Sequence, residues 1–304
     1  MKEPLFSGTG VALVTPFSKG RVDYRSLERI IEYTIAGGVD YLVCLGSTGE
    51  AVSLSAAECR RILDFTLRIT NGRLPVVAGF FGGNYTAALA QKIAQYNFDG
   101  VAGILSSSPA YSKPSQEGIY QHYMAIAETS PVPIIIYNVP GRTASNVNAS
   151  TLIRLANASE KFVAVKEASG DMIQTAQLIK NKQRHFQVLS GDDPTCLPAL
   201  SMGANGVISV IANALPDAFS DMVRLARQGD FRTARSIHLQ LLDLHHWLYV
   251  EGNPPGIKSA MQILGMGSNE VRLPLSKMSE ANYAMLKKEL DQVMNALKAM
   301  HPHI

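Results

Sequence analysis

The stretch Val132-Pro133-Ile134-Ile135-Ile136-Tyr137-Asn138 places three consecutive isoleucines between a proline and a polar end. The run is too short for a helix of ordinary length, and its branched residues favour an extended chain. Its apolar residues do not alternate with polar ones, so both faces of the strand must be buried, as in a parallel sheet covered by helices. The stretch therefore predicts a central parallel strand whose carboxyl end, at Tyr137 and Asn138, lies at the edge of the core.

Seven further apolar runs have the same character, and they start about 20 to 35 residues apart, which is the length of a strand–helix unit. They lie at residues 11–14, 41–45, 75–79, 101–105, 162–165, 187–189 and 206–210. The segments between the runs predict amphipathic helices. One spans residues 26–36 and is closed by Gly37-Gly38, another begins at Ser55 with Glu58 completing a capping box, and a third is capped by Ser115.

Eight strand–helix units without a break predict an α/β fold, a closed (β/α)8 TIM barrel. A doubly wound sheet is the alternative, but it usually has fewer strands. We assign residues 1–215 to the barrel and residues 216–304 to a C-terminal helical extension packed on it. The helices expected in this tail span residues 218–227, 231–247, 255–264 and 281–299.

The composition narrows the class of protein. With 304 residues, 46% of them hydrophobic and 17% charged, the chain can build a large core, and disorder is excluded. A net charge of +3 is too small to predict binding to nucleic acid or to a membrane surface. Three widely spaced cysteines indicate a reducing compartment, and Met1-Lys2-Glu3-Pro4 begins no apolar leader, so we expect a cytoplasmic protein.

Candidate catalytic groups follow from the rule that barrel enzymes place them at the C-terminal ends of strands. Lys166 ends one apolar run, where dry surroundings would favour a neutral amine that can form a Schiff base. Its alternative fate is to reach solvent or to pair with Glu167. Tyr137 ends another run and could relay protons, or could simply cover the core. Arg142, in the loop after it, could clamp a carboxylate or remain a solvated charge.

Two loops carry further polar groups. Gly46-Ser47-Thr48-Gly49-Glu50 follows the second run, and its small residues let backbone N–H groups approach an anion. A tight turn capped by its hydroxyls is the alternative. Ser190-Gly191-Asp192-Asp193 follows the seventh run, but further metal ligands do not stand nearby in sequence, so helix capping is expected there. His245-His246, inside the tail, is expected to serve packing or to lie at the surface.

Taken together, these residues resemble the dihydrodipicolinate synthase / N-acetylneuraminate lyase family of class I aldolases, over essentially the whole chain. The matching segments are residues 10–17, 46–50, 109–121, 137–143, 165–170, 190–193 and 206–213. The resemblance implies a (β/α)8 barrel with a C-terminal helical extension, assembled as a homotetramer of two tight dimers. It implies no cofactor and no metal, because a protonated imine serves as the electron sink.

The resemblance also implies roles for individual residues. Lys166 matches the lysine that forms an imine with pyruvate, and Tyr137 matches the tyrosine that shuttles protons. Ser47 keeps the hydroxyl of the relay, and Tyr111 matches a relay tyrosine that the partner subunit supplies across the tight dimer. Residues expected to bind substrate are Thr48 at the pyruvate carboxylate, Gly191 and Ile208 along the pyruvate pocket, and Arg142.

Arg142 decides between the branches of the family. The sequence Asn138-Val139-Pro140-Gly141-Arg142-Thr143 is similar to the loop with which dihydrodipicolinate synthases hold the carboxylate of aspartate semialdehyde, and sialic acid lyases typically lack this arginine. The sequence of residues 46–50 is common in the lyases, but a serine in place of threonine at residue 47 preserves the hydroxyl. We therefore expect pyruvate and L-aspartate 4-semialdehyde as substrates, in lysine and diaminopimelate biosynthesis.

Other functions stay open at this point. A lyase for sialic acid or an aldolase for 2-keto-3-deoxy sugar acids would use the same lysine. A catalytically inactive barrel that binds a keto acid as a sensor would not need a lysine that forms an imine. A phosphate-binding isomerase would meet two aspartates after the seventh strand, and these would repel phosphate.

Feedback by lysine is expected to be weak. Relatives inhibited by lysine hold it at the tight dimer interface with a glutamate. Asn84 and Tyr111 are kept here, whereas Ala88 stands where the carboxylate would be. The other matching positions are Val52, Ala56, Cys59 and Ala110.

Overall fold

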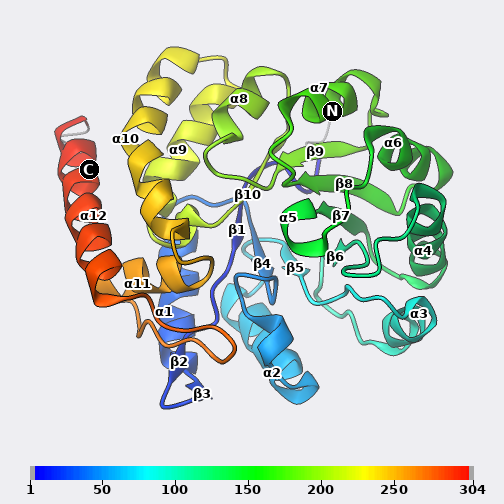
Figure 1. Cartoon of the computed structure of the whole chain (residues 1–304), viewed down its shortest axis with the longest axis horizontal. Helices are drawn as coiled ribbons and strands as arrows, with labels where there is room; N and C mark the ends of the chain where they lie inside the picture. The colour runs from blue at the N-terminus through cyan, green and yellow to red at the C-terminus, as the bar shows by residue number, and fades with distance from the viewer. Residues whose placement is uncertain (1–3, 301–304) are drawn as a thin grey trace.

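Eight parallel strands close into a barrel, in the spatial order β1-β10-β9-β8-β7-β6-β5-β4, with β4 pairing back to β1 (Figure 1). They are β1 Gly8–Ala12, β4 Tyr41–Cys44, β5 Val76–Ala78, β6 Gly103–Ser107, β7 Ile134–Asn138, β8 Phe162–Glu167, β9 Gln187–Ser190 and β10 Gly206–Ser209. This computed structural model describes residues 4–300, so Met1-Lys2-Glu3, used above to argue against a leader, lies outside it. The prediction of a TIM barrel is confirmed.

Each predicted run overlaps one barrel strand, but the first strand begins earlier than expected. The prediction started it at residue 11, whereas β1 begins at Gly8. Gly8 and Gly10 resemble turn residues in the sequence, yet both are needed inside the strand. A Cβ on Gly10 would lie 2.3 Å from the ring of Tyr41, and one on Gly8 would lie 2.0 Å from the carboxylate of Asp40. The glycines therefore let β1 pass close to its neighbours in a crowded part of the barrel wall.

A helix follows each strand of the barrel and covers it from outside. These helices are α1 Tyr24–Ala36, α2 Ala56–Thr70, α3 Thr86–Gln95, α4 Gln116–Thr129, α6 Ala149–Ala158, α7 Met172–Asn181, α8 Cys196–Ser201 and α9 Pro216–Arg227. The capping box of Ser55 and Glu58 is confirmed, and Ser115 accepts from the N–H of Gly118 as expected. The first helix begins at Tyr24 rather than at residue 26, because Asp23 is its N-cap and accepts from the N–H of Ser26.

Short elements occupy the loops between these helices and strands. Phe17–Ser18 (β2) and Arg21–Val22 (β3) form a small hairpin after β1. Ala51–Ser53 (η1) follows β4, Pro140–Thr143 (α5) follows β7, and Ile211–Asn213 (η2) follows β10. Several of these elements lie at the carboxyl ends of the strands, where the candidate residues are placed.

Side chains inside and outside the barrel wall form separate packed layers. Alternate residues of β7 illustrate the division, since Ile135 and Tyr137 belong to the inner cluster and Ile134 and Ile136 to the outer one. The inner cluster also holds Ala12, Tyr41, Val43, Val77, Leu105, Ala164, Leu189 and Ile208. The barrel interior is thus filled with side chains, and chemistry is confined to its mouth.

Three further helices follow α9 in the described part of the chain. α10 (Phe231–Tyr249) packs on α9, α12 (Glu280–Met300) packs on α10, and α11 (Pro255–Ile263) contacts both (Figure 1). The placement of helices in the tail agrees with the prediction within a few residues, while the division of the chain at residues 215 and 216 stays a prediction. Within residues 4–300, no helix is long and apolar enough to cross a membrane. The three cysteines are free and buried.

Candidate active site

Lys166 and Tyr137 meet at the mouth of the barrel. The parallel pairing of β7 with β8 sets Tyr137 opposite Lys166. Both side chains point into the barrel, and the Lys166 Nζ lies 4.6 Å from the centroid of the Tyr137 ring. Lys166 is 5% exposed and Tyr137 is 8% exposed, so substrate would reach an amine in largely dry surroundings. The arrangement brings an amine nucleophile and a phenol proton donor together.

Glu167 does not neutralise this lysine, because the next residue of a strand points to the opposite face. Its buried carboxylate accepts from Asn138 Nδ2 at 3.0 Å, from Gln174 Nε2 at 2.9 Å and from the Ser169 N–H at 2.8 Å. Among the described residues, Lys166 forms no ion pair with Glu167. The alternative in which Lys166 pairs with its neighbour is wrong. The bond from Asn138 instead ties β7 to β8 directly behind Lys166 and Tyr137.

Gly191 and Ile208 border the same space. A Cβ on Gly191 would lie 3.0 Å from the Cγ of Lys166 and 2.6 Å from the Cβ of Ala168. The loop after β9 can approach the lysine this closely only without a side chain. Ile208, on β10, is buried in the inner cluster below. Gly191 thus lies beside Lys166 and Ile208 in the packed layer inside the barrel, while their role in lining a pyruvate pocket stays a prediction.

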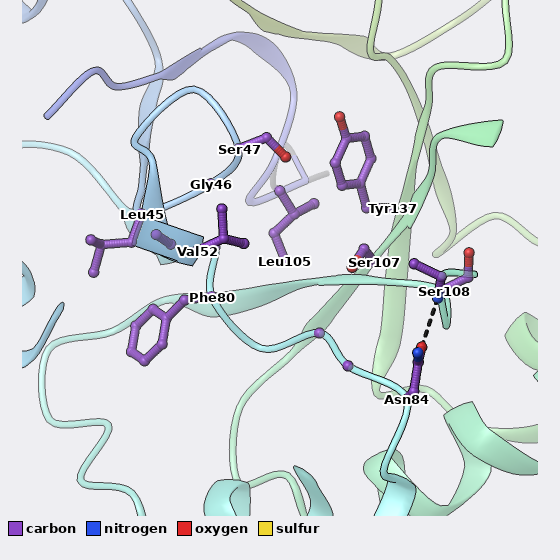
Figure 2. A pocket seen from close by; sticks show the side chains of 15 residues that line it. Leu45, Gly46, Ser47, Val52, Phe80, Asn84, Leu105, Ser107, Ser108 and Tyr137 are labelled. Carbon is purple, nitrogen blue, oxygen red and sulfur yellow. Dashed lines mark hydrogen bonds between the residues drawn. The ribbon is translucent and has the colours of Figure 1, made fainter. Parts of the chain in front are cut away.

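The turn after β4 brings hydroxyls to the mouth. Ser47 is half-buried and borders, together with Tyr137 and Leu105, a cavity of about 350 Å³. Figure 2 shows Ser47 and Tyr137 at one end of this cavity and Asn84 at the other. Thr48 is buried, and its Oγ1 accepts from Asn253 Nδ2 at 2.9 Å. Within residues 4–300 the Ser47 hydroxyl has no hydrogen-bond partner, whereas the Thr48 hydroxyl is held from the C-terminal part of the chain.

Tyr111 and Arg142 lie further out. Tyr111 is 91% exposed and has a φ of +67°, which a tyrosine rarely adopts. Its backbone N–H donates to the carbonyl of Thr143, and its ring does not border the cavity next to Tyr137 of its own chain. Arg142 is exposed on α5, and its Nη2 donates to the carbonyl of Asn253 at 3.2 Å. The fold therefore brings Lys166, Tyr137 and Gly191 together and sets Arg142 at the rim.

The sequence pattern of the Dihydrodipicolinate synthetase family matches residues 5–293. The chain belongs to this family. It is 46% identical to a 4-hydroxy-tetrahydrodipicolinate synthase of Parabacteroides distasonis over 94% of this chain and 96% of that one. It also resembles the crystal structure of dihydrodipicolinate synthase from Aquifex aeolicus, with a TM-score of 0.91, 40% identity and coverage of 94% and 98%. A third relative, from Acinetobacter baumannii and solved in complex with pyruvate, gives a TM-score of 0.91 at 37% identity, with coverage of 95% and 99%.

Within the family barrel, Asn253 is a residue that sequence reasoning missed. Its amide bonds Thr48, and its carbonyl accepts from Arg142, so it joins two candidate substrate contacts. The sequence indicates only a loop before a helix, in Asn253-Pro254-Pro255. Because Thr48 lies 205 positions earlier, nothing local to Asn253 reveals this contact.

Asp193 caps a different element from the one expected. Its Oδ2 accepts from the N–H groups of Val210 and Ile211, both at 2.9 Å, at the start of η2. The helix α8 that follows it in sequence has Thr195 as its N-cap, which makes no side-chain capping bond. Burial raises the pKa of Asp193, and these backbone bonds oppose that rise. The expected capping is real, but the carboxylate links the loop after β9 to the loop after β10.

Proposed function

We propose that this protein is a 4-hydroxy-tetrahydrodipicolinate synthase, which condenses pyruvate with L-aspartate 4-semialdehyde in lysine and diaminopimelate biosynthesis. The observation that carries the proposal is the buried amine of Lys166 over the Tyr137 ring at the barrel mouth, with no carboxylate within ion-pair distance among the described residues. A lysine held in this way serves as an imine-forming nucleophile. The curated relatives named above support the choice of reaction.

The first half of the reaction is the activation of pyruvate. The neutral Lys166 amine attacks the keto carbon, and the resulting carbinolamine loses water to give a protonated imine. This cation draws electrons from the neighbouring methyl group, so that loss of one methyl proton leaves an enamine. Each proton transfer needs a nearby donor or acceptor, and Tyr137 and Ser47 are placed for that role beside the cavity they share.

The second half joins the two substrates. The enamine carbon attacks the aldehyde carbon of aspartate semialdehyde, and the aldehyde oxygen takes up a proton. The substrate amine then attacks the imine carbon, which closes the ring and releases the Lys166 amine. Arg142 at the rim would hold the semialdehyde carboxylate, while Thr48 and its backbone would hold that of pyruvate, with Gly191 and Ile208 lining the pocket. Arg142 favours this reaction over a sialic acid lyase.

The exposed Tyr111 supports the proposed assembly, a homotetramer of tight dimers with an active site shared between subunits. The Tyr111 phenol is exposed on its own chain and would complete the relay of a neighbour. Val52 and Tyr85 are 98% and 74% exposed, so apolar side chains gather on the loops around the same end of the cavity. An exposed apolar group of this kind is typical of a subunit contact. The three buried thiols suit a reducing cytoplasm.

The decisive experiment combines trapping with product analysis. Borohydride reduction in the presence of pyruvate should add one reduced pyruvyl group, located on Lys166 by peptide mass mapping. Lys166→Ala should lose both the adduct and turnover. Lys161→Ala, an exposed lysine at the other end of β8, should keep both. An adduct on another lysine, or cleavage of N-acetylneuraminate in place of condensation, would contradict the proposal.

Arg142→Ala tests the branch assignment. Loss of one charge-assisted carboxylate contact costs about 1.5–3 kcal/mol, so kcat/KM for aspartate semialdehyde should fall by about 10- to 150-fold. Trapping of the pyruvate imine at Lys166 should stay close to that of the parent. Unchanged use of the semialdehyde would remove the main argument for this branch.

A further inference from the structure

A buried ion pair joins the turn after β4 to helix α11. The Nζ of Lys258 donates to Oε1 of Glu50, and each side chain is 1% exposed. The two residues are 208 positions apart, and Glu50 is the last residue of the turn that carries Ser47 and Thr48. This pair is not part of the reaction described above.

Both charges have a complete set of partners. Lys258 also donates to the carbonyl of Glu270 at 2.8 Å, and its Nζ lies 4.0 Å from the centroid of the Phe17 ring. The other carboxylate oxygen of Glu50 accepts from the N–H of Arg272 at 3.0 Å. The guanidinium of Arg272 in turn binds the carboxylate of Glu58 at the start of α2. The Glu50 side chain is therefore held by the C-terminal part of the chain.

Stability alone is a poor reason for such a pair. Removing two charges from water is costly, and well-packed apolar residues in place of a buried ion pair are often as stable or more so. Glu50 also adopts a φ of +55°, a left-handed conformation that is unfavourable for a residue with a side chain. Two costly features thus meet at one residue, directly beside the hydroxyls at the barrel mouth.

The conformation of this turn determines where its donors point. The Glu50 N–H donates to the carbonyl of Ser47 at 3.1 Å, and the carbonyl of Gly49 accepts from Thr15 Oγ1 at 2.7 Å. Both bonds close the turn around Thr48, whose N–H and hydroxyl are the groups available to a carboxylate. Displacement of the Glu50 side chain would let the turn relax toward a less strained backbone and spread these donors.

We propose that Lys258 is a positioning residue, which acts through Glu50 to hold the turn of residues 46–50 in the conformation that binds the carboxylate of pyruvate. This inference rests on the proposed function. It assigns the C-terminal helices a part in the affinity for the first substrate, whereas Arg142 governs the second. The pair acts by geometry, because a neutral pair adds little net field at a nearby anion.

The test compares three variants with the parent enzyme. Glu50→Gln keeps the shape and an acceptor, Lys258→Met removes the cation, and the double variant removes both charges. Each should raise the KM for pyruvate at least about tenfold, while the KM for aspartate semialdehyde stays within about twofold. The double variant should regain the thermal stability that Lys258→Met loses, because no unpaired charge remains buried, yet its KM for pyruvate should stay high.

Ser259→Ala provides the matched control. Ser259 is buried on α11 next to Lys258, but its hydroxyl donates to the carbonyl of Pro255 and not to the turn. This variant should change neither KM. If Lys258→Met does not fold, Glu50→Gln decides the question on its own. Folded variants with the pyruvate KM of the parent, or a double variant that regains stability and pyruvate KM together, would overturn the inference.

Two measurements separate this inference from the proposed function. The parent must first form the pyruvate imine and the condensation product, and failure there refutes the proposed function. The pyruvate concentration that gives half-maximal borohydride trapping at Lys166 then reports the affinity for pyruvate without the second substrate. A parent that traps pyruvate beside variants that trap it equally well would refute only the role of Lys258.

Discussion

Gly191 lies where a side chain would collide with the lysine of the neighbouring strand. Gly191→Ala would place a Cβ 2.6 Å from the Ala168 Cβ, so the loop must shift, and 3.0 Å from the Lys166 Cγ, so the lysine must give way as well. We expect the rate of imine trapping at Lys166 to fall at least about tenfold, with a stability loss of about 1–3 kcal/mol from overpacking. Trapping kinetics and thermal melting measure the two effects separately.

Gly118→Ala is the control for this substitution. A Cβ on Gly118, in the first turn of α4, would meet its nearest atom at 3.4 Å, which is close to ordinary contact. Trapping at Lys166 should be unchanged in this variant. Normal trapping by Gly191→Ala would show that the loop after β9 yields easily and that the glycine is not required there.

The residues of the candidate site differ in whether a feature of the nearby sequence predicts them. Lys166 and Tyr137 could be predicted, because each is a polar residue at the end of an apolar run and the barrel rule then brings them together. Asn253 and Lys258 could not be predicted as partners of the turn after β4. Their hydrogen bonds join residues more than 200 positions apart. In addition, no feature of the nearby sequence identifies the counter-ion of a lysine inside an apolar helix segment.

His245, on α10, is a buried histidine whose ring nitrogens both lack a hydrogen-bond partner among the described residues. Burial lowers its pKa to about 4, and His238 on the same helix acts in the same direction. The folded protein therefore holds a neutral ring, while the unfolded chain takes up a proton near pH 6.5. Stability from this residue is complete above pH 6.5 and is lost as the pH falls toward 4.

His245→Phe should remove this pH dependence. At pH 7 the variant should match the parent or exceed its free energy of unfolding by about 1 kcal/mol, because an unpartnered polar ring becomes apolar. At pH 5 it should gain a further advantage of about 2 kcal/mol. Equilibrium urea unfolding at the two pH values measures both differences.

His246→Phe is the matched control, because His246 is the next residue of α10 and is exposed. Its substitution should not alter the pH dependence of stability. An equal loss of stability at pH 5 in the parent and in His245→Phe would contradict the assignment. The sequence expectation for this histidine pair, packing or surface, is met with one residue in each position.

Periodicity and capping residues predict the helices and strands. The errors in the bounds of single elements have local causes. β1 begins among glycines that look like a turn, and only the ring of Tyr41 explains why they are needed. α1 begins earlier because Asp23 caps it. The position of Asp193 before a helix predicts a cap of that helix, whereas its Oδ2 accepts from η2, in the loop after the neighbouring strand β10. Such pairings depend on the chain topology, which cannot be read from the local sequence.

The lining of the cavity beside Tyr137 predicts how strongly lysine inhibits turnover. Its described lining holds Val52, Asn84 and Ala110 and contains no charged side chain. A lysine cation entering this space would lose hydration without gaining a carboxylate partner. We expect no inhibition of turnover at lysine concentrations below about 1 mM, since the missing charge-assisted contact costs about 10- to 150-fold in affinity. Clear inhibition in that range, relieved by Asn84→Ala, would show that the site has been misread.

Assembly is tested best by mixing two inactive chains. Tyr111→Phe should depress turnover, although Tyr111 is 91% exposed and does not border the cavity beside its own Tyr137. If the phenol serves the neighbouring subunit, a dimer of Tyr111→Phe with Lys166→Ala contains one site in which both groups are intact. Subunit exchange between the two variants should therefore restore part of the activity, measured after mixing and verified by mass spectrometry of intact dimers.

Two further observations bear on this experiment. Lys161→Ala mixed with Lys166→Ala sets the activity expected when one chain is fully competent. Verified mixed dimers of Tyr111→Phe and Lys166→Ala that stay inactive would argue that each chain works alone.

The bracing of the turn after β4 by Asn253, Lys258 and Arg272 has a consequence for the order in which the protein is made. A ribosome delivers a chain from its N-terminus, and folding begins before synthesis ends. All eight barrel strands precede residue 210, so they emerge well before the residues that hold this turn. A nascent chain can thus present Lys166 and Tyr137 while its turn is still unsupported. A translation product released early would carry Lys166 without a finished turn at the barrel mouth.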